Sequence, residues 1–205
     1  MKRYIIIILL CALALSLTAA TTAEVYAKMQ SAYKNLSTFQ ANVKQTNYYP
    51  QLKRSIVYDG KIYFSPGRML MSFDKPHTQR LVIQNSRVEL YDAQSNTLFK
   101  ARMLPQFGKM NPVEILQVYW TKSTVKITRE SGDIAQVKLI PKDDPLVTSL
   151  EASIHKKSGI VQTLSYSDSS GNTVTYAFSG IKTNAAIPAS VWNFSYPKDA
   201  QIIEQ

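Results

Sequence analysis

The segment Gly60–Pro76, GKIYFSPGRMLMSFDKP, restricts the fold more than any other part of this chain. Its apolar residues repeat with a period of two on either side of a Ser65-Pro66-Gly67 turn. They are Ile62, Phe64, Met69, Met71 and Phe73. Alternation with this period places side chains on one face of a strand, and a Pro-Gly pair reverses the chain. The segment therefore predicts an antiparallel hairpin with one face rich in Met and Phe.

The same alternation predicts strands along most of the chain. The expected strands begin near residue 38 and continue at 56–64, 69–73, 80–84, 87–91, 97–101, 124–129, 134–140, 150–155, 161–166 and 173–178. A last segment from Ile187 places Trp192, Phe194 and Tyr196 on one face. Because no long repeat and no low-complexity linker divides these elements, we expect one α+β domain with about ten strands, dominated by an antiparallel sheet.

Two helices interrupt the alternation. Residues 21–36 carry an apolar stripe that starts at Val25, and Thr21 with Glu24 has the spacing of a capping box. The second helix follows a loop at 103–110, with Asn111 as its cap and Pro112 at its first position. This helix is apolar on most sides, so we expect it to lie against the Met- and Phe-rich face of the sheet.

The first 20 residues have the pattern of a secretory signal peptide. Lys2 and Arg3 precede an apolar run from Tyr4 to Leu17, and Thr18-Ala19-Ala20 resembles a cleavage site. We therefore expect cleavage of 1–20 and a mature domain at 21–205, the alternative being an uncleaved anchor. Cys11 belongs to the apolar run, so the mature chain would contain no cysteine and would depend on its core for stability.

The charge is strongly basic, but the basic residues are scattered. Without Lys2 and Arg3 the chain keeps a charge of about +8. Several lysines occupy alternate strand positions, such as Lys53, Lys61 and Lys126. This is typical of a solvated outer face, and no cluster interleaves with aromatic residues as nucleic-acid modules require. We expect no nucleic-acid partner.

No residue set in the sequence points to catalysis. The two histidines, His77 and His155, lie far apart and are expected at the surface, and the Asp143-Asp144 pair before Pro145 is interpreted as a turn. Phosphate-loop and nucleophile-elbow motifs are missing from the sequence. The prediction is a protein that is not an enzyme, with no metal site and no cofactor.

The middle third of the chain is unusually rich in methionine and phenylalanine. The residues concerned are Met69, Met71, Met103 and Met110, with Phe64, Phe73, Phe99, Phe107 and Trp120. Methionine adapts to varied apolar ligands, which favours a binding surface. The same residues would also suit the plain core of a sheet packed under helices. Both interpretations remain open at this point.

Five pieces in order resemble the LolA family of periplasmic lipoprotein carriers over essentially the whole mature sequence. They are the helix to Leu36 followed by Phe39–Thr46; Gly60–Phe64 with Pro66 and Met69; Pro76 with Leu81–Ile83; Val88–Asp92; and the closing residues Asn184, Ile187-Pro188, Trp192–Phe194 and Pro197. The resemblance implies an incomplete antiparallel β-barrel, a half-barrel whose apolar cavity is covered by a lid of helices.

The resemblance also implies a function. Such a monomeric carrier shields the acyl chains of a lipoprotein, receives it from an inner-membrane release complex and passes it to an outer-membrane acceptor, approaching membranes only transiently. The expected acyl-binding residues are Ile62, Phe64, Met69, Met71, Phe73, Leu81, Ile83, Leu90, Leu116 and Trp120. Family members carry an arginine before the hairpin proline that ties the lid to the barrel. Ser65 stands there in this chain, so Arg68 is the candidate lid latch.

Two other functions fit the same half-barrel. One is a carrier of another lipid or glycolipid, and the other is a sensor that binds mislocalised lipoprotein and signals envelope stress. Regulators of the second kind usually carry a further domain, for which this chain has little room. An envelope hydrolase is the third alternative, and it lacks a catalytic set.

Overall fold

The computed structural model describes residues 19–34, 36–102 and 112–204, with the backbone alone for residues 112–114. Its α-helices are α1 (Thr22–Lys34) and α2 (Pro112–Thr121). The strands are β1 (Phe39–Tyr49), β2 (Arg54–Ser65), β3 (Arg68–Lys75), β4 (Gln79–Gln84), β5 (Arg87–Asp92), β6 (Thr97–Arg102), β7 (Ser123–Ser131), β8 (Ile134–Pro141), β9 (Ser149–His155), β10 (Val161–Ser167), β11 (Thr173–Thr183) and β12 (Gln201–Glu204). The predicted signal peptide, the 103–110 loop and the Asn111 cap lie outside the described residues.

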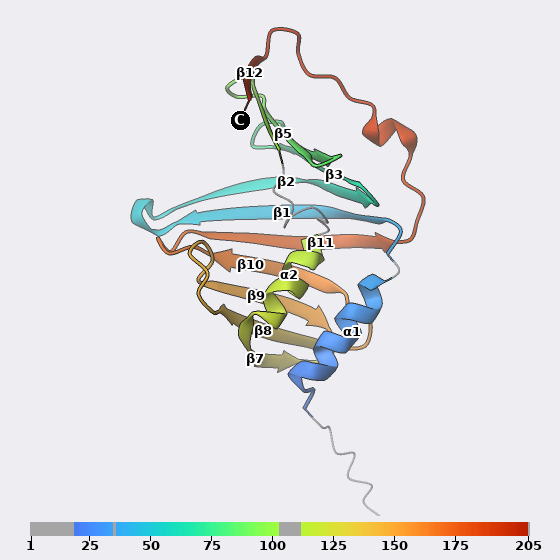
Figure 1. Ribbon diagram of the computed structural model, residues 1–205, viewed down its shortest axis with the longest axis vertical. Helices are drawn as coiled ribbons and strands as arrows, with labels where there is room; N and C mark the ends of the chain where they lie inside the picture. Colours follow the sequence, from blue (N-terminus) through green and yellow to red (C-terminus); the bar gives the residue numbers. More distant parts are fainter. Residues whose placement is uncertain (1–18, 35, 103–111, 205) are drawn as a thin grey trace, which may run out of the picture.

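These strands form one open sheet in the order β12-β6-β5-β4-β3-β2-β1-β11-β10-β9-β8-β7. Neighbouring strands are antiparallel except β12, which pairs with β6 in parallel. Both helices lie against one face, over the part of the sheet that contains β7–β11 (Figure 1). The expected α+β fold with an unclosed, mainly antiparallel sheet is confirmed. We call the face under the helices the inner face and the opposite one the outer face.

The predicted hairpin is formed by β2 and β3. Ile62 pairs with Met71 and Phe64 with Met69, so the two apolar sets share the inner face. The β2–β3 register shifts between Asp59 and Gly60, and a Cβ on Gly60 would lie 2.1 Å from the carbonyl oxygen of Ser72. A β-bulge with close backbone approach therefore lies at this glycine.

Helix α1 begins with the predicted capping box. The Thr21 hydroxyl accepts a hydrogen bond from the Glu24 N–H at 3.2 Å, and the Glu24 carboxylate accepts one from the Thr21 N–H at 2.8 Å. From this start the apolar stripe turns toward the sheet and buries Val25, Met29 and Tyr33. The helix therefore packs through one face, as its sequence periodicity predicts.

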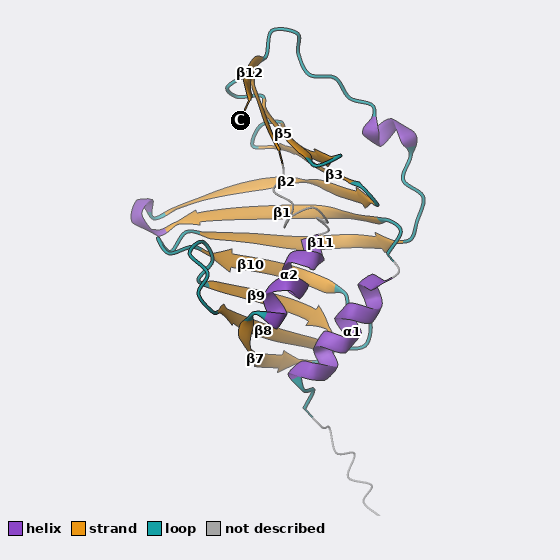
Figure 2. Cartoon of the chain, viewed as in Figure 1, coloured by secondary structure: helices purple, strands orange, loops and turns teal. Residues whose placement is uncertain are grey.

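The C-terminal segment from Ile187 is not a strand until β12 begins at Gln201. Residues 184–200 form an extended strap with one short 3-10 turn, Ala189–Trp192, which passes to the outer face before β12 (Figure 2). Its aromatic residues do contact one face of the sheet: the rings of Tyr196 and Tyr91 lie 5.5 Å apart. The Tyr196 hydroxyl donates a hydrogen bond to Glu89 at 3.0 Å. Side-chain contacts, and no backbone ladder, hold this segment to the sheet.

Candidate functional site: an apolar face under the helices

Two cross-strand rows of apolar side chains form the candidate site. In register across β2 to β6, the first row is Ile62, Met71, Leu81, Leu90 and Phe99. The second row is Phe64, Met69, Ile83, Val88 and Ala101. Since side chains at paired positions share a face, both rows lie on the inner face. All eight strand residues expected at the site lie on this face, with Phe73 one pair beyond Met71.

Helix α2 joins this surface. Leu116 and Trp120 belong to the same buried cluster as Ile62, Met69, Met71, Phe73 and Ile83, and Phe64 and Leu81 pack against that cluster. The structure therefore places nine of the ten expected residues in or against one hydrophobic cluster. Leu90 continues the first row beyond the cluster, opposite Leu81.

Coverage of the inner face declines from the middle of the sheet to its edge. Ile62 is 0% exposed and Met71 6%, whereas Phe99 in the same row is 41% exposed. Leu116 of α2 is 0% exposed and belongs to the buried cluster that includes the covered end of the row. In the described part of the chain, the expected cavity is thus occupied by side chains under the helices, and its apolar wall emerges into solvent at β5 and β6.

Besides the core packing of Leu116 and Trp120, two side-chain contacts link α2 to its surroundings. The Tyr119 hydroxyl donates a hydrogen bond to the Asp144 carboxylate at 2.9 Å, and Trp120 stacks on Tyr26 of α1 with ring centres 5.2 Å apart. Burial, together with the nearby Asp144 carboxylate, raises the pKa of Tyr119 to about 12. The Asp144 carboxylate also accepts hydrogen bonds from the backbone N–H groups of Leu146 and Val147, as expected for a turn. The hydrogen bond between Asp144 and Tyr119 of α2 could not be predicted from the sequence.

Helix α1 is anchored more tightly. The Tyr33 hydroxyl accepts a hydrogen bond from the Val161 N–H of β10 at 3.2 Å, within the core. Gly159, at φ 72°, approaches the helix so closely that a Cβ there would lie 2.2 Å from the carbonyl oxygen of Lys28. Backbone contact of this kind leaves no room for sliding, so α1 is a fixed wall of the site.

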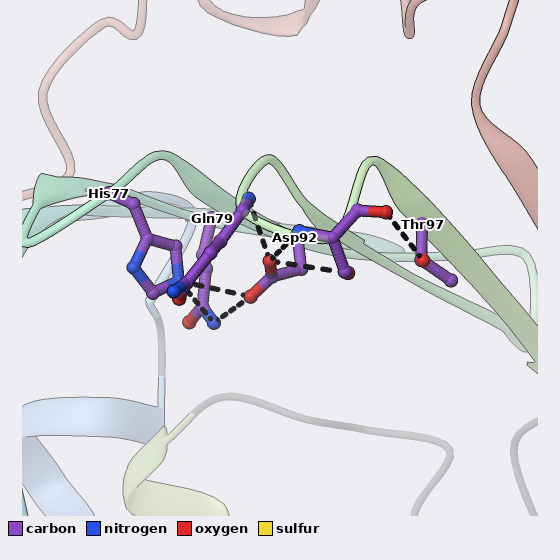
Figure 3. Close-up of polar contacts among 6 residues, drawn as sticks. His77, Gln79, Asp92 and Thr97 are labelled. Carbon is purple, nitrogen blue, oxygen red and sulfur yellow. Dashed lines mark hydrogen bonds and ion pairs between the residues drawn. The ribbon is translucent and has the colours of Figure 1, made fainter.

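A polar row borders the first apolar row. Gln79 of β4, Asp92 of β5 and Thr97 of β6 are in register on the inner face, and His77 joins them from the preceding turn (Figure 3). The Asp92 carboxylate lies 3.0 Å from His77 Nε2 and accepts hydrogen bonds from Gln79 and Ser95. Burial alone would raise the pKa of Asp92, but these hydrogen bonds lower it to about 2.

His77, which was expected at the surface, is only partly exposed and takes part in this polar row. Its side chain is mostly buried, with the ring of Tyr58 packed edge-on at 6.0 Å. The partner carboxylate lies 15 residues away, and only the β4–β5 pairing brings it close.

The expectation that Arg68 ties the lid to the sheet is corrected by its position. Arg68 alternates with Met69 and so lies on the outer face, away from both helices. Its Nε donates a hydrogen bond to Ser65 at 3.0 Å, and its guanidinium lies 4.1 Å from the ring centre of Trp192. Arg68 holds the C-terminal strap in place, and the helices are held by Tyr119 and Tyr33 instead.

Within the described ranges, no cluster of three or more His, Cys, Asp or Glu side chains is arranged to hold a metal ion. Among those same residues, no helix has the length and hydrophobicity needed to cross a membrane.

Comparison with known proteins identifies the family. The profile of the family described as "Outer membrane lipoprotein carrier protein LolA" matches residues 34–195. The chain belongs to the LolA family. An outer-membrane lipoprotein carrier protein of Pseudomonas fluorescens is 31% identical over 144 residues, which cover 68% of each chain. One from Pseudomonas putida is 26% identical over 211 residues, covering 99% of this chain and 100% of that protein.

Solved structures share the fold of this LolA-family chain at much lower identity. A conserved protein of Thermus thermophilus has a TM-score of 0.56 and 15% identity, covering 89% of this chain and 98% of its own. The Pseudomonas aeruginosa MucA/MucB complex gives a TM-score of 0.51 at 12% identity, covering 85% of this chain and 62% of that one. At these identities the likeness concerns the open sheet and its helices.

Proposed function

We propose that this protein is a periplasmic carrier that holds the acyl chains of lipoproteins against its inner face, without catalysis. The observation that carries the proposal is the apolar row from Ile62 to Phe99, which runs without a polar interruption from the buried core to an exposed edge. A chain of methylene groups can enter at the edge and extend inward along this row. Membership of the LolA family supports the same role.

The energetics require such a face. Burying a methylene group stabilises it by about 0.8 kcal/mol, so the acyl chains of a lipoprotein cross water only when shielded. Full shielding needs the space that Leu116 and Trp120 now fill, so α2 has to move outward. For cargo to enter, the contacts of α2 with Asp144 and Tyr26 break and the buried Leu116 leaves the core.

The proposal extends to export and partners. Residues 1–20 act as a cleaved signal peptide, and 21–205 form the mature carrier. An inner-membrane complex releases the cargo to the carrier, which delivers it to an acceptor at the outer membrane. The relatives' name, outer-membrane lipoprotein carrier protein, supports this route.

The first experiment is native mass spectrometry of mature protein isolated from the periplasm, followed by extraction of any bound lipid. Co-purified acylated protein is the expected result. Free phospholipid or glycolipid would keep the binding face but change the cargo to a lipid, and an empty protein that takes up no fluorescent acyl probe would contradict the proposal.

A matched pair of variants tests the binding face. Phe99→Asp places a charge at the open end of the row, and Val57→Asp places one on the outer face at the same 41% exposure. We expect Phe99→Asp to lower acyl-probe affinity about tenfold and Val57→Asp to leave it unchanged. Equal effects of the two variants would contradict the assignment of the inner face.

A further inference from the structure

A row of arginines crosses the outer face at one end of β3–β6. Arg68 begins β3 and pairs with Gln84 at the end of β4. Gln84 pairs with Arg87 at the start of β5, which pairs with Arg102 at the end of β6. Three guanidinium groups therefore share one row and one face, and we call these four residues the arginine row.

Two of these arginines are direct cross-strand neighbours, which is unfavourable in isolation. Arg87 and Arg102 are both exposed and directly opposite each other, and like charges in this position repel. The arginine row itself contains no carboxylate. The next row contains Glu89, which accepts the hydrogen bond of Tyr196 and lies opposite Lys100, itself paired with Glu204 at 3.8 Å.

At the other end of the sheet, a pair of like charges on neighbouring strands is balanced by a carboxylate. Lys126 of β7 lies opposite Lys138 of β8, and Lys138 lies opposite Glu151 of β9. The Lys138 ammonium and the Glu151 carboxylate form an ion pair at 2.9 Å. Among the described residues, the chain neutralises the lysine pair internally, whereas neither Arg87 nor Arg102 forms an ion pair there.

The surroundings of the arginine row show what chemistry it would meet. A hollow of about 520 Å³ lies beside it, lined by Val82, Gln84, Asn85, Arg87 and Glu89. Trp192 of the strap lies against Arg68 at the same end. On the inner face, the strand ends carry the apolar row from Phe64 to Ala101. Arginine and tryptophan beside apolar side chains is the composition that proteins present at the headgroup level of a bilayer.

We propose that the arginine row docks this protein on an anionic phospholipid surface. Lipid phosphates relieve the repulsion between Arg87 and Arg102 and supply a counter-charge to both guanidinium groups. Because the row lies at the strand ends, docking brings the mouth of the inner apolar face toward the membrane without inserting it. The contact would be transient, since each basic residue near an anionic membrane strengthens binding only about fivefold.

The test is flotation of mature protein with vesicles of equimolar phosphatidylethanolamine and phosphatidylglycerol, compared with phosphatidylcholine alone. We expect binding to the anionic vesicles at low salt that weakens as salt screens the charges. The variant Arg87→Gln/Arg102→Gln should bind about 25-fold more weakly. The control Lys126→Gln/Arg129→Gln removes the same charge from exposed positions on β7 and should bind like the wild type.

Two results would overturn the docking proposal. One is equal loss in the two double variants, which would assign binding to net charge. The other is no binding to anionic vesicles at low salt, which would point to an acidic protein as the partner of the row. Acyl-probe affinity is measured on the same samples: the arginine variant should retain it, and Phe99→Asp should lower it about tenfold while still binding vesicles. Docking and cargo binding can therefore fail separately.

Discussion

The two halves of the sheet are stabilised in opposite ways. In the half that contains β7–β11, the helices bury the inner face, and Leu139, Leu150 and Ile154 have almost no exposed surface. In β3–β6 the strap covers the outer face instead, where Leu70 and Val82 are buried, while the inner row opens to Phe99. A sheet must bury at least one face, and here each half uses a different segment of the chain to do so.

This difference explains how one sheet can be stable and still expose an apolar surface that binds a ligand. Covering the outer face of β3–β6 supplies buried area that leaves the inner face at β5 and β6 available to a ligand. The helix-covered half then serves as a rigid base and the strap-covered half as the binding wall. Substitutions in the two halves should therefore separate stability from acyl binding.

The largest effect is expected where α1 meets the sheet. Gly159→Ala places a Cβ against the carbonyl of Lys28 at a positive φ, so the free energy of unfolding should fall by about 3 kcal/mol or more. Gly132→Ala is the control, because φ is also positive there but no atom lies within 4 Å of the added Cβ, and its cost should be about 1 kcal/mol. Urea unfolding measures the free energy of unfolding of both variants. Equal decreases would show that close packing of Gly159 against α1 does not contribute to stability.

The strap should matter next. The Phe194 ring lies 4.8 Å from the guanidinium carbon of Arg80, so Phe194→Ala should lower the free energy of unfolding by about 1–2 kcal/mol. Acyl-probe affinity should stay within twofold, because the strap lies on the outer face. A loss of affinity without a loss of stability would mean that the two faces are not independent.

A smaller effect is expected at the attachment of α2. Tyr119→Phe removes the hydrogen bond to Asp144 at a cost of about 1 kcal/mol and should speed acyl-probe uptake, since α2 then opens more easily. Tyr48→Phe, at an exposed tyrosine of β1, is the control and should change neither quantity. Stopped-flow fluorescence measures the uptake rate, and slower uptake in Tyr119→Phe would exclude α2 as the moving element.

The smallest effect concerns the polar row. The pKa of Asp92 is about 2 in the folded protein against 3.8 as the ordinary value, so its contribution to stability is present above pH 4 and is lost as the pH falls toward 2. Asp92→Asn should remove under about 1 kcal/mol at neutral pH, because water screens a group near the surface. Its free energy of unfolding should also fall less steeply than that of the wild type between pH 4 and pH 2. Parallel pH profiles would show that the ionised carboxylate contributes nothing.

Local rules in the sequence determined the elements of this protein. The capping box at Thr21 and the period-two alternation around Ile62 act through residues close in the chain, and each predicts what the structure contains. Alternation also identified the inner-face residues, because a strand with one apolar face has only one way to bury it.

Strand order, which depends on distant pairings, decided the rest. The Asp92–His77 contact, the arginine row and the Tyr119–Asp144 hydrogen bond all join residues brought together by sheet register or by helix docking. Arg68 shows most clearly what the sequence cannot predict. Its position close to the hairpin proline suggests a link to the helices, but alternation along β3 places its side chain on the outer face, against Trp192. A sequence specifies which residues alternate, whereas only the assembled sheet specifies what covers each face.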